Sequence, residues 1–324
     1  MDDLRPIGRT DIRVTPLGLG IMQFAGGSGT FRYMFPPIDQ PSMTSVIGAA
    51  LEGGINWFDT AEMYGRGRSE RGLATALQQL SIAPRSVSIA TKWLPFFRTA
   101  GSIGRTIDQR LEALAPFPVD LYQIHFPYSY SSPEAEMNAM ADLVEAGKVR
   151  AVGVSNFNAR QMRRAHAALA KRGLPLASNQ MHYSLLHREI ETNGVLDAAR
   201  ELGVSIIAYS PLDSGLLTGK FHRDPKLLDT TPAGRRMMLR RRLESSRPVI
   251  EALEAIGAEH DATPSQVALA WLVRAHGDMV LAIPGARTPA HAREAAAALR
   301  VELSSEEIGR LEALTAPAGA RRAA

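Results

Sequence analysis

Short hydrophobic runs recur along the chain, separated by longer stretches of mixed polar and apolar residues. Eight such runs stand out, and they are Pro16–Gly20, Ile55–Phe58, Val87–Thr91, Val119–Ile124, Val149–Val154, Leu176–Gln180, Val204–Tyr209 and Met279–Ile283. Because most of them are continuously apolar and do not alternate, each is typical of a strand that is buried on both faces, as in a parallel sheet. The pattern therefore predicts eight parallel strands.

The intervals between these runs carry signals for helix starts. Ser131-x-x-Glu134 and Ser304-x-x-Glu307 have the spacing of a capping box, and Thr263-Pro264-Ser265-Gln266 combines a cap, a proline in the first turn and a glutamine at the third helical position. Eight strand–helix units without a break in composition predict an α/β fold, a single (β/α)8 TIM barrel over residues 1–324 with a C-terminal helix after Ser304.

The segment before the first run predicts a β-hairpin. Its strands are Leu4–Ile7 and Ile12–Val14, joined by a turn at residues 8–11, and the hairpin could close the bottom of the barrel. The rival parallel fold, a doubly wound sheet, needs a dinucleotide-binding fingerprint after its first strand. Here Gly18-Leu19-Gly20 is followed by Ile21-Met22-Gln23, so the third glycine is missing and the barrel is favoured.

The composition removes several kinds of chemistry. The 324 residues include no Cys, which excludes disulfides, Cys-ligated zinc, iron–sulfur clusters and thiol nucleophiles. His182 and His187 are five residues apart, which is not the spacing of a helix-borne metal pair, so we expect no metal site. The charged N-terminal residues and the lack of any apolar run of 18 residues predict a soluble, cytoplasmic protein with no membrane partner.

Positive charge is concentrated in one segment. The net charge is +4, and residues 213–247 alone hold nine Lys and Arg against four Asp and Glu, including Arg235, Arg236, Arg240, Arg241 and Arg242. Few aromatic residues are interleaved, so a nucleic-acid partner is not expected. A solvated face, a loop that grips a small polyanion and a surface for a macromolecular partner all remain open.

Polar residues stand where the predicted strands end, and in an α/β barrel the carboxyl ends of the strands face the active site. Asp59 follows the second run, with Tyr64 five residues later, Lys92 follows the third run and His125 follows the fourth. Each residue alone could cap a helix, pack or lie on the surface. Together, a carboxylate, a phenol, an ammonium and an imidazole at three consecutive strand ends predict a catalytic group.

These four residue types have a coherent joint role. Asp59 would keep a buried Lys92 charged, and the ammonium would lower the pKa of the Tyr64 phenol toward neutrality. Tyr64 could then deliver a proton to a developing alkoxide while His125 orients the carbonyl. Without a thiol, a metal cluster or a nucleophile elbow, hydride from a nicotinamide is the natural source of the electron pair.

Longer strings carry a family resemblance. They are Gly54-Ile55-Asn56-Trp57-Phe58-Asp59-Thr60-Ala61-Glu62-Met63-Tyr64-Gly65, Ala90-Thr91-Lys92, Asp120-Leu121-Tyr122-Gln123-Ile124-His125, Gly153-Val154-Ser155-Asn156-Phe157, Tyr209-Ser210-Pro211-Leu212, Gly215-Leu216-Leu217-Thr218-Gly219-Lys220 and Ile283-Pro284-Gly285-Ala286. In this order they resemble the aldo-keto reductase superfamily, in particular its bacterial and plant branch related to potassium-channel beta subunits. The resemblance runs from the hairpin to about Leu314.

The resemblance implies roles for individual residues. It implies a catalytic tetrad of Asp59, Tyr64, Lys92 and His125, and an NADP(H) cofactor. The cofactor-binding residues it implies are Gly20, Met22, Asp59, Ser155, Asn156, Gln180, Tyr209, Ser210, Pro211, Leu212, Gly215, Leu216, Lys220, Gly285, Arg287, His291 and Glu294. Among these, Asn156 and Gln180 would hold the nicotinamide carboxamide, and Tyr209 would stack on its ring.

Two positions depart from the family pattern. His291 stands where the family has an Arg or Gln for the adenosine phosphate, and Glu294-Ala295 replaces the usual Glu-Asn pair. Arg287 or the basic segment would have to compensate for the weaker His291. NADP(H) is therefore the expected cofactor, with NAD(H) not excluded.

The substrate is expected to be a small-molecule aldehyde or ketone, hydrophobic or aromatic in character. The residues predicted to line its pocket are Met22, Phe24, Trp57, Trp93, Phe96, Phe126 and Tyr128, with Phe97 and Tyr130 nearby. Two other functions stay open: a non-catalytic, cofactor-sensing subunit, and a barrel isomerase or hydrolase that would leave Asn156, Gln180 and Tyr209 without a role. The sequence does not predict the oligomeric state.

Overall fold

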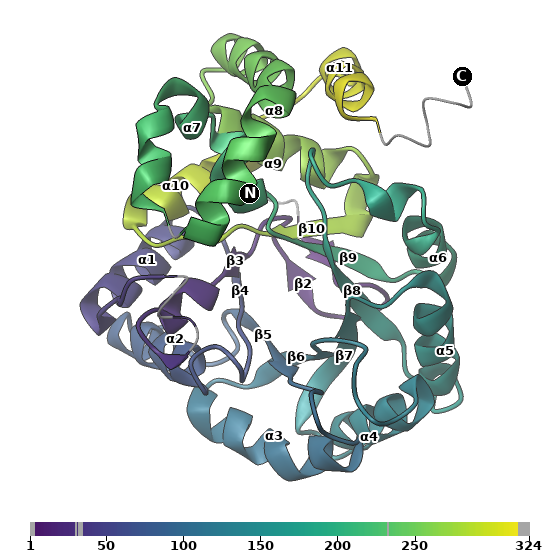
Figure 1. Ribbon diagram of the computed structural model, residues 1–324. Helices are drawn as coiled ribbons and strands as arrows, with labels where there is room; N and C mark the ends of the chain where they lie inside the picture. Colours follow the sequence, from purple (N-terminus) through teal and green to yellow (C-terminus); the bar gives the residue numbers. More distant parts are fainter. Residues whose placement is uncertain (1–3, 30, 32–34, 232, 317–324) are drawn as a thin grey trace.

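Eight parallel strands form a barrel in the computed structural model, which describes residues 4–29, 31, 35–231 and 233–316 (Figure 1). In chain order they are β3 (Leu19–Gly20), β4 (Trp57–Asp59), β5 (Ser88–Trp93), β6 (Val119–Ile124), β7 (Val149–Ser155), β8 (Leu176–His182), β9 (Ser205–Tyr209) and β10 (Val280–Ile283). Each strand pairs with its neighbour in sequence. The predicted (β/α)8 TIM barrel is confirmed.

The barrel closes where the first strand meets the last. Isolated parallel bridges join Leu17 to Ala282 and Gly20 to Gly285, and the Gly18 amide donates to the Ala282 carbonyl at 2.8 Å. β3 is shorter than the predicted run Pro16–Gly20, because only its last two residues pair continuously with β4. The first strand is thus the least extensively paired part of the barrel wall.

Helices surround the strands. The outer ring consists of α1 (Gln40–Glu52), α2 (Arg68–Gln79), α3 (Gly101–Leu114), α4 (Pro133–Glu145), α5 (Ala159–Ala170), α6 (Val195–Leu202), α9 (Pro264–Arg274) and α10 (Pro289–Ala297). Between β9 and α9 the chain adds α7 (Lys220–Arg223) and α8 (Ala233–Glu259), and α11 (Ser305–Thr315) follows the barrel. No helix within the described ranges combines the length and apolar character that a membrane crossing requires.

Most of the predicted helix starts hold. Thr263 and Ser304 cap α9 and α11 in complete capping boxes with Gln266 and Glu307. The start of α4 is one residue later than predicted: Ser132, not Ser131, caps the helix by accepting from the Ala135 amide. The reason is Pro133, whose fixed φ favours the first helical position directly after the cap.

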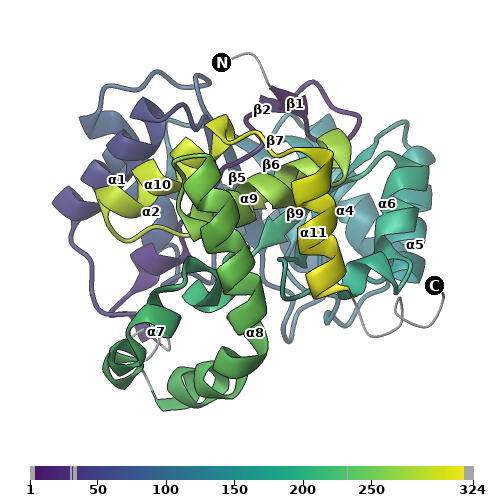
Figure 2. The ribbon, with the colours of Figure 1, turned by 90° about the horizontal axis from the view of Figure 1, so that it is seen from above.

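The N-terminal hairpin seals one end of the barrel. β1 (Arg5–Pro6) pairs antiparallel with β2 (Arg13–Val14), and Ile7, Ile12 and Val14 pack with inward side chains of the strands. Figure 2 shows this hairpin at one end of the molecule and the segment around α7 at the other. Among the described residues, apolar side chains fill the hairpin end, so we expect a ligand to enter from the opposite end, where the carboxyl ends of the strands lie.

Candidate active site

A buried ion pair lies at the centre of the open end. Asp59 is the last residue of β4, and Lys92 lies on the neighbouring β5; both side chains are almost completely buried. The Lys92 ammonium donates to Asp59 Oδ1 and, at 2.8 Å, to the carbonyl of Thr60. Burial lowers the pKa of Lys92, and the charge of Asp59 opposes this shift. The paired carboxylate therefore favours the charged form of the lysine.

The Tyr64 ring lies next to the Asp59–Lys92 ion pair. The turn after β4 positions it, with the Tyr64 amide donating to the Ala61 carbonyl at 3.0 Å. Lys92 Nζ is 5.3 Å from the centre of the Tyr64 ring, and the ring meets the His125 ring edge to face at 5.7 Å. The structure thus brings together all four residues of the predicted tetrad.

The pKa of Tyr64 differs from the expectation. Burial raises it well above its ordinary value, and the charge of Asp59 and the nearby Tyr209 add to this effect. The sequence predicts that the charge of Lys92 lowers this pKa toward neutrality, but the burial of the phenol and the opposing charge of Asp59 prevail. Tyr64 therefore keeps its proton at neutral pH.

His125 is held in its neutral form. Burial and the charge of Lys92 lower its pKa well below the usual value. Phe126 stacks against the imidazole with ring centres 4.4 Å apart and planes within 3° of parallel. Nδ1 is buried and has no hydrogen-bond partner among the residues that the structure describes. A neutral imidazole can donate one hydrogen bond to a carbonyl oxygen without charging the site.

Two amides and an aromatic ring border the tetrad. Asn156, which has a left-handed backbone (φ 60°), donates from Nδ2 to the His125 carbonyl at 3.2 Å and accepts from the Tyr209 hydroxyl at 3.0 Å. The Gln180 amide donates to Asp59 Oδ2 at 2.9 Å, and Ser155 donates to the Gln180 carbonyl. The predicted nicotinamide-binding residues therefore surround the same point as the tetrad.

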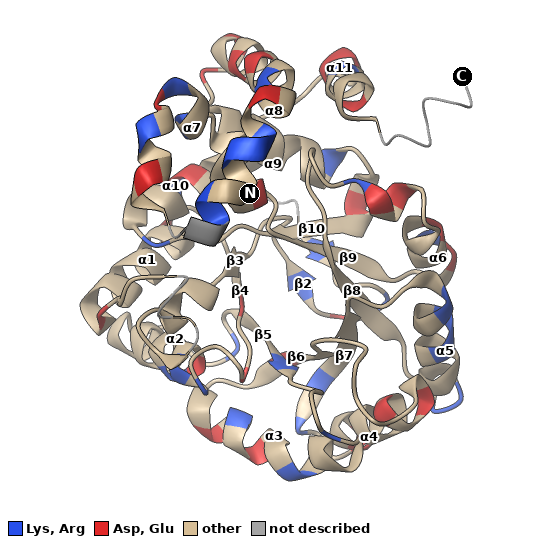
Figure 3. Cartoon of the chain, viewed as in Figure 1, with Lys and Arg blue, Asp and Glu red and all other residues tan. Residues whose placement is uncertain are grey.

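Positive side chains gather at the outer edge of the open end. Arg235 Nη2 donates to the Ser214 carbonyl at 2.7 Å, beside the turn at Gly215 (φ 86°) and the side chain of Lys220. Partial burial and the charge of Arg235 lower the pKa of Lys220. Figure 3 shows Lys and Arg along α7 and α8. Of the basic segment, Arg242 is neutralised by the buried carboxylate of Asp213.

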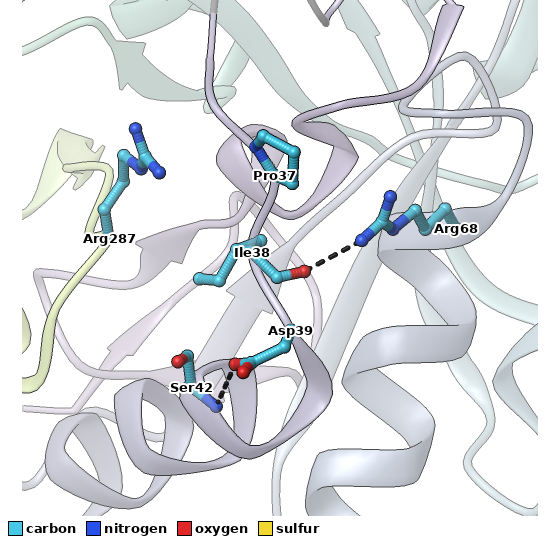
Figure 4. A pocket seen from close by; sticks show the side chains of 6 residues that line it. All are labelled: Pro37, Ile38, Asp39, Ser42, Arg68 and Arg287. Carbon is cyan, nitrogen blue, oxygen red and sulfur yellow. Dashed lines mark hydrogen bonds between the residues drawn. The ribbon is translucent and has the colours of Figure 1, made fainter.

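Arg287 lies two residues before α10, which carries His291 and Glu294. Arg287 borders an open cavity of about 470 Å³ that Arg68 and Asp39 also line (Figure 4). Burial and the charge of Lys220 lower the pKa of His291, and Glu294 accepts from the Thr263 hydroxyl at 2.8 Å. Lys220 and Arg287 both lower the pKa of His291, whereas Glu294 raises it. We refer to Lys220 and Arg287, with the neighbouring His291, as the cationic cluster.

The remaining predicted cofactor residues lie at or after the carboxyl ends of β3, β9 and β10, and Leu216 among them is completely buried beside Phe221. Gly20 and Gly285 are paired across the closure of the barrel, and Met22 packs in the small cluster that contains Tyr64. Ser210, Pro211, Leu212 and Leu216 lie on the loop that runs from β9 through the 3-10 turn Asp213–Thr218.

The structure corrects the substrate pocket at three positions. Trp57 points into the sealed end of the barrel, where it packs with the hairpin, because it is two residues below Asp59 on the same face of β4. Trp93 follows Lys92 and points the opposite way, to Ser102 on α3. Phe24 is completely buried in the main core. Met22, Phe96, Phe126 and Tyr128 remain as candidates.

Three aromatic rings form a stacked wall beside His125. Phe96 and Phe126 are stacked at 5.1 Å, and Tyr128 stacks on both at about 6 Å. Phe96 and Tyr128 are exposed, so the wall continues from the buried imidazole to the solvent. Phe97 and Tyr130 are more exposed still, and neither makes a ring contact among the described residues.

The sequence reasoning missed one buried polar residue in the site. Gln123 lies on β6, is completely buried and donates to Asp59 Oδ2 at 3.2 Å. The available signal was its position: an amide inside an otherwise apolar strand, two residues before His125 and therefore on the same face.

Comparison with known proteins agrees with this geometry. The family profile of the aldo/keto reductases matches residues 16–316, and the chain belongs to the aldo/keto reductase family. An uncharacterized oxidoreductase of Mycobacterium tuberculosis is 35% identical, over 91% of this chain and 87% of the relative. A chloroplastic pyridoxal reductase of Arabidopsis thaliana is 33% identical, over 93% of this chain and 83% of that protein.

Solved structures give the same result. A thermostable aldo-keto reductase in complex with the inhibitor epalrestat superposes with a TM-score of 0.76 at 30% identity, over 96% of this chain and 99% of that one. A putative 2,5-diketo-D-gluconic acid reductase B gives 0.73 at 27% identity, over 98% and 93%. The protein is therefore an oxidoreductase of a family that acts on small carbonyl compounds.

Proposed function

We propose that this protein is an NADP(H)-dependent carbonyl reductase that converts an aldehyde or ketone to an alcohol, with Tyr64 as the proton donor. One observation carries the proposal: the four tetrad side chains and the amides of Asn156 and Gln180 converge at the end of the barrel opposite the N-terminal hairpin. A single ligand at that point can touch a proton donor, a hydrogen-bond donor and two amides at once.

The residues present fit a nicotinamide dinucleotide. At the inner end, the amides of Asn156 and Gln180 match the donor and acceptor of a carboxamide, and Tyr209 offers a ring face. At the outer end, Lys220, Arg235, Arg287 and His291 match phosphate groups. When bound, the nicotinamide supplies or accepts the hydride.

Residues of the protein itself hold the proton and donate it to the substrate. The raised pKa of Tyr64 keeps the phenol protonated, so that it can donate to a carbonyl oxygen once negative charge develops there. Neutral His125 donates a hydrogen bond to the same oxygen and fixes its direction. The Lys92 ammonium, 5.3 Å from the centre of the Tyr64 ring, would attract the phenolate that remains after transfer, and its pairing with Asp59 weakens this attraction.

The stacked wall favours a planar, aromatic carbonyl compound as substrate. Phe126 and Phe96 offer parallel ring faces that begin at His125, and aromatic rings prefer such offset stacking. The relative named pyridoxal reductase acts, by its name, on an aromatic aldehyde, and it supports the same substrate class.

Turnover of a carbonyl panel tests the proposal. We expect purified protein with NADPH to reduce aromatic aldehydes, followed by the loss of nicotinamide absorbance, and to accept NADH less well. Tyr64→Phe should abolish reduction and leave NADPH binding nearly unchanged, because the phenol serves the carbonyl and not the cofactor. A Tyr64→Phe variant with more than about a tenth of wild-type turnover would contradict the assignment.

The alternative is a cofactor-sensing subunit without catalysis. The intact tetrad argues against it, since a sensor has no need of a protonated phenol beside a buried ion pair. Tight NADPH binding without turnover of any carbonyl or alcohol in the panel would favour the sensor.

A further inference from the structure

The second oxygen of Asp59 has two amide donors. Lys92 occupies Oδ1, whereas Oδ2 accepts from Gln180 Nε2 at 2.9 Å and from Gln123 Nε2 at 3.2 Å. The two amides also meet each other, with Gln180 Nε2 at 3.4 Å from Gln123 Oε1. The three side chains come from β4, β6 and β8, alternate strands of the barrel, which is how one layer of a barrel interior is built.

The neighbouring strand makes room for Gln123. Gly153 of β7 is the register partner of Gln123, and a Cβ at that position would lie 3.2 Å from Gln123 Cγ and 2.3 Å from Ser178 Oγ. Any larger residue at position 153 would push both side chains inward. Glycine on β7 therefore permits the Gln123 amide to lie flat across the barrel toward Asp59.

Under the proposed function, the Gln180 side chain forms hydrogen bonds both to the ligand and to Asp59. Its amide is the one expected to hold the nicotinamide carboxamide, yet it also donates to Asp59. One amide nitrogen carries two hydrogens, so engagement by a ligand competes with the bonds to Asp59 and Gln123. Gln123 is deeper and completely buried, and its bond to Asp59 does not depend on the ligand.

We propose that Gln123 is a positioning residue for the reduction: it holds Asp59 Oδ2 so that Oδ1 stays on Lys92, and it links the cofactor-binding Gln180 to the tetrad. The inference rests on the proposed function. A carboxylate fixed at one oxygen can rotate about its Cβ–Cγ bond, and rotation would draw the Lys92 ammonium away from the Tyr64 ring. Two fixed oxygens prevent this rotation.

The test replaces Gln123 without changing its volume. Gln123→Met removes both hydrogen-bonding functions, and we expect kcat to fall about tenfold or more, as for a lost bond to a buried charge. The dissociation constant of NADPH should stay within about threefold, because Asn156, Tyr209 and the cationic cluster are untouched. Ser178→Ala is the control, a buried interior residue whose hydroxyl has no partner among the described residues; its kcat should match the wild type.

Gln123→Glu separates positioning from packing. A glutamic acid at this position can donate to Asp59 only when protonated, so its turnover relative to wild type should rise as pH falls. At a pH where the glutamic acid of this variant is protonated and can donate to Asp59, turnover should approach that of the wild type and exceed that of Gln123→Met. For a residue that only fills space, Gln123→Met would already equal the wild type. If Gln123→Met keeps wild-type kcat, or if Gln123→Glu follows the wild-type profile, the inference is overturned.

A structural readout keeps this inference separate from the proposed function. If the wild type reduces no carbonyl, the proposed function fails, and a crystal structure of Gln123→Met still decides the role of Gln123. A rotated Asp59 with a displaced Lys92 ammonium would support positioning. An Asp59–Lys92 pair that superposes on the wild type would overturn it.

Discussion

The inner and outer parts of the site handle charge in opposite ways. Inside the barrel, Asp59 and Lys92 are buried, paired and hydrogen-bonded to neighbouring amides and a carbonyl. At the outer edge, Lys220 and Arg287 act electrostatically on His291, Glu294 opposes them, and Asp39 lines the same cavity as Arg287. In the inner region the charges pair with each other inside the protein, whereas in the outer region the basic side chains can pair with an external anion.

Under the proposed function, this difference assigns the reaction to the inner region and the preference for one cofactor to the outer region. Buried charges interact strongly and are shielded from salt, so a change to one of them affects the fold and the reaction together. Partly exposed cations interact weakly with each other and are screened. We therefore expect large, salt-independent effects from the inner region and small, salt-dependent and pH-dependent effects from the outer region.

The largest effect should come from breaking the inner ion pair. Lys92→Met leaves the buried Asp59 carboxylate without its cation, so we expect a loss of stability of about 3–5 kcal/mol and a fall in turnover of at least about a hundredfold. Urea unfolding and a carbonyl assay measure the two effects. The double variant Asp59→Asn/Lys92→Met should regain stability and stay inactive. If the double variant is as unstable as Lys92→Met, the unpaired charge is not the cause.

A smaller effect is expected where the two regions meet. Tyr209→Ala removes the ring that would stack on the nicotinamide, and we expect the dissociation constant of NADPH to rise about three- to tenfold. Fluorescence titration gives the constant. Tyr209→Phe keeps the ring and loses only the bond to Asn156, so it should bind almost as well as the wild type. Unchanged affinity for Tyr209→Ala would mean that the ring only packs.

The outer region should distinguish the two cofactors. Arg287→Ala is expected to weaken NADPH binding about tenfold, close to 1.4 kcal/mol for one charge-assisted bond, and to leave NADH binding nearly unchanged. Arg293→Ala, an exposed arginine on α10, the helix that follows Arg287, is the control and should alter neither. Equal loss for both cofactors would instead place Arg287 at the shared pyrophosphate.

The smallest effect is the titration of His291. A protonated His291 attracts the 2′-phosphate better, so NADPH affinity should fall a few-fold as pH rises through the His291 pKa, which burial holds below its usual 6.5 in the free protein. Added salt should reduce the preference for NADPH further. The phosphate itself titrates with a pKa near 6, and His291→Gln retains that contribution. Identical pH profiles for His291→Gln and the wild type would remove His291 from the site.

The sequence was informative wherever local pattern decides structure. The run Val119–Ile124 coincides with β6, and the hairpin and the caps at Thr263 and Ser304 are where the pattern placed them. The meeting of Asp59, Tyr64, Lys92 and His125 was predictable because strand ends share one rim of a barrel, so residues far apart in sequence lie together there.

What the sequence could not supply depends on side-chain direction and on burial. Trp57 and Trp93 were expected at the mouth, but strand alternation sends one to the sealed end and the other to the helices. The pKa of Tyr64 depends on how completely its phenol is buried and on the neutralisation of Lys92 by Asp59, which no pattern of residue types reports. Gln123 was visible in the sequence, but its bond to Asp59 needs three strands in register.

The short first strand has a consequence for how the barrel opens. Few backbone bonds hold this closure, among them the Gly20 amide to the Pro284 carbonyl at 3.0 Å and the Ala282 amide to the Pro16 carbonyl at 2.9 Å. Amide hydrogens along β3 and β10 should therefore exchange with solvent sooner than those of the continuously paired β6 and β7. A ligand that contacts both Gly20 and Gly285 connects β3 with β10. While it is bound it should slow this exchange and stabilise the closure of the barrel.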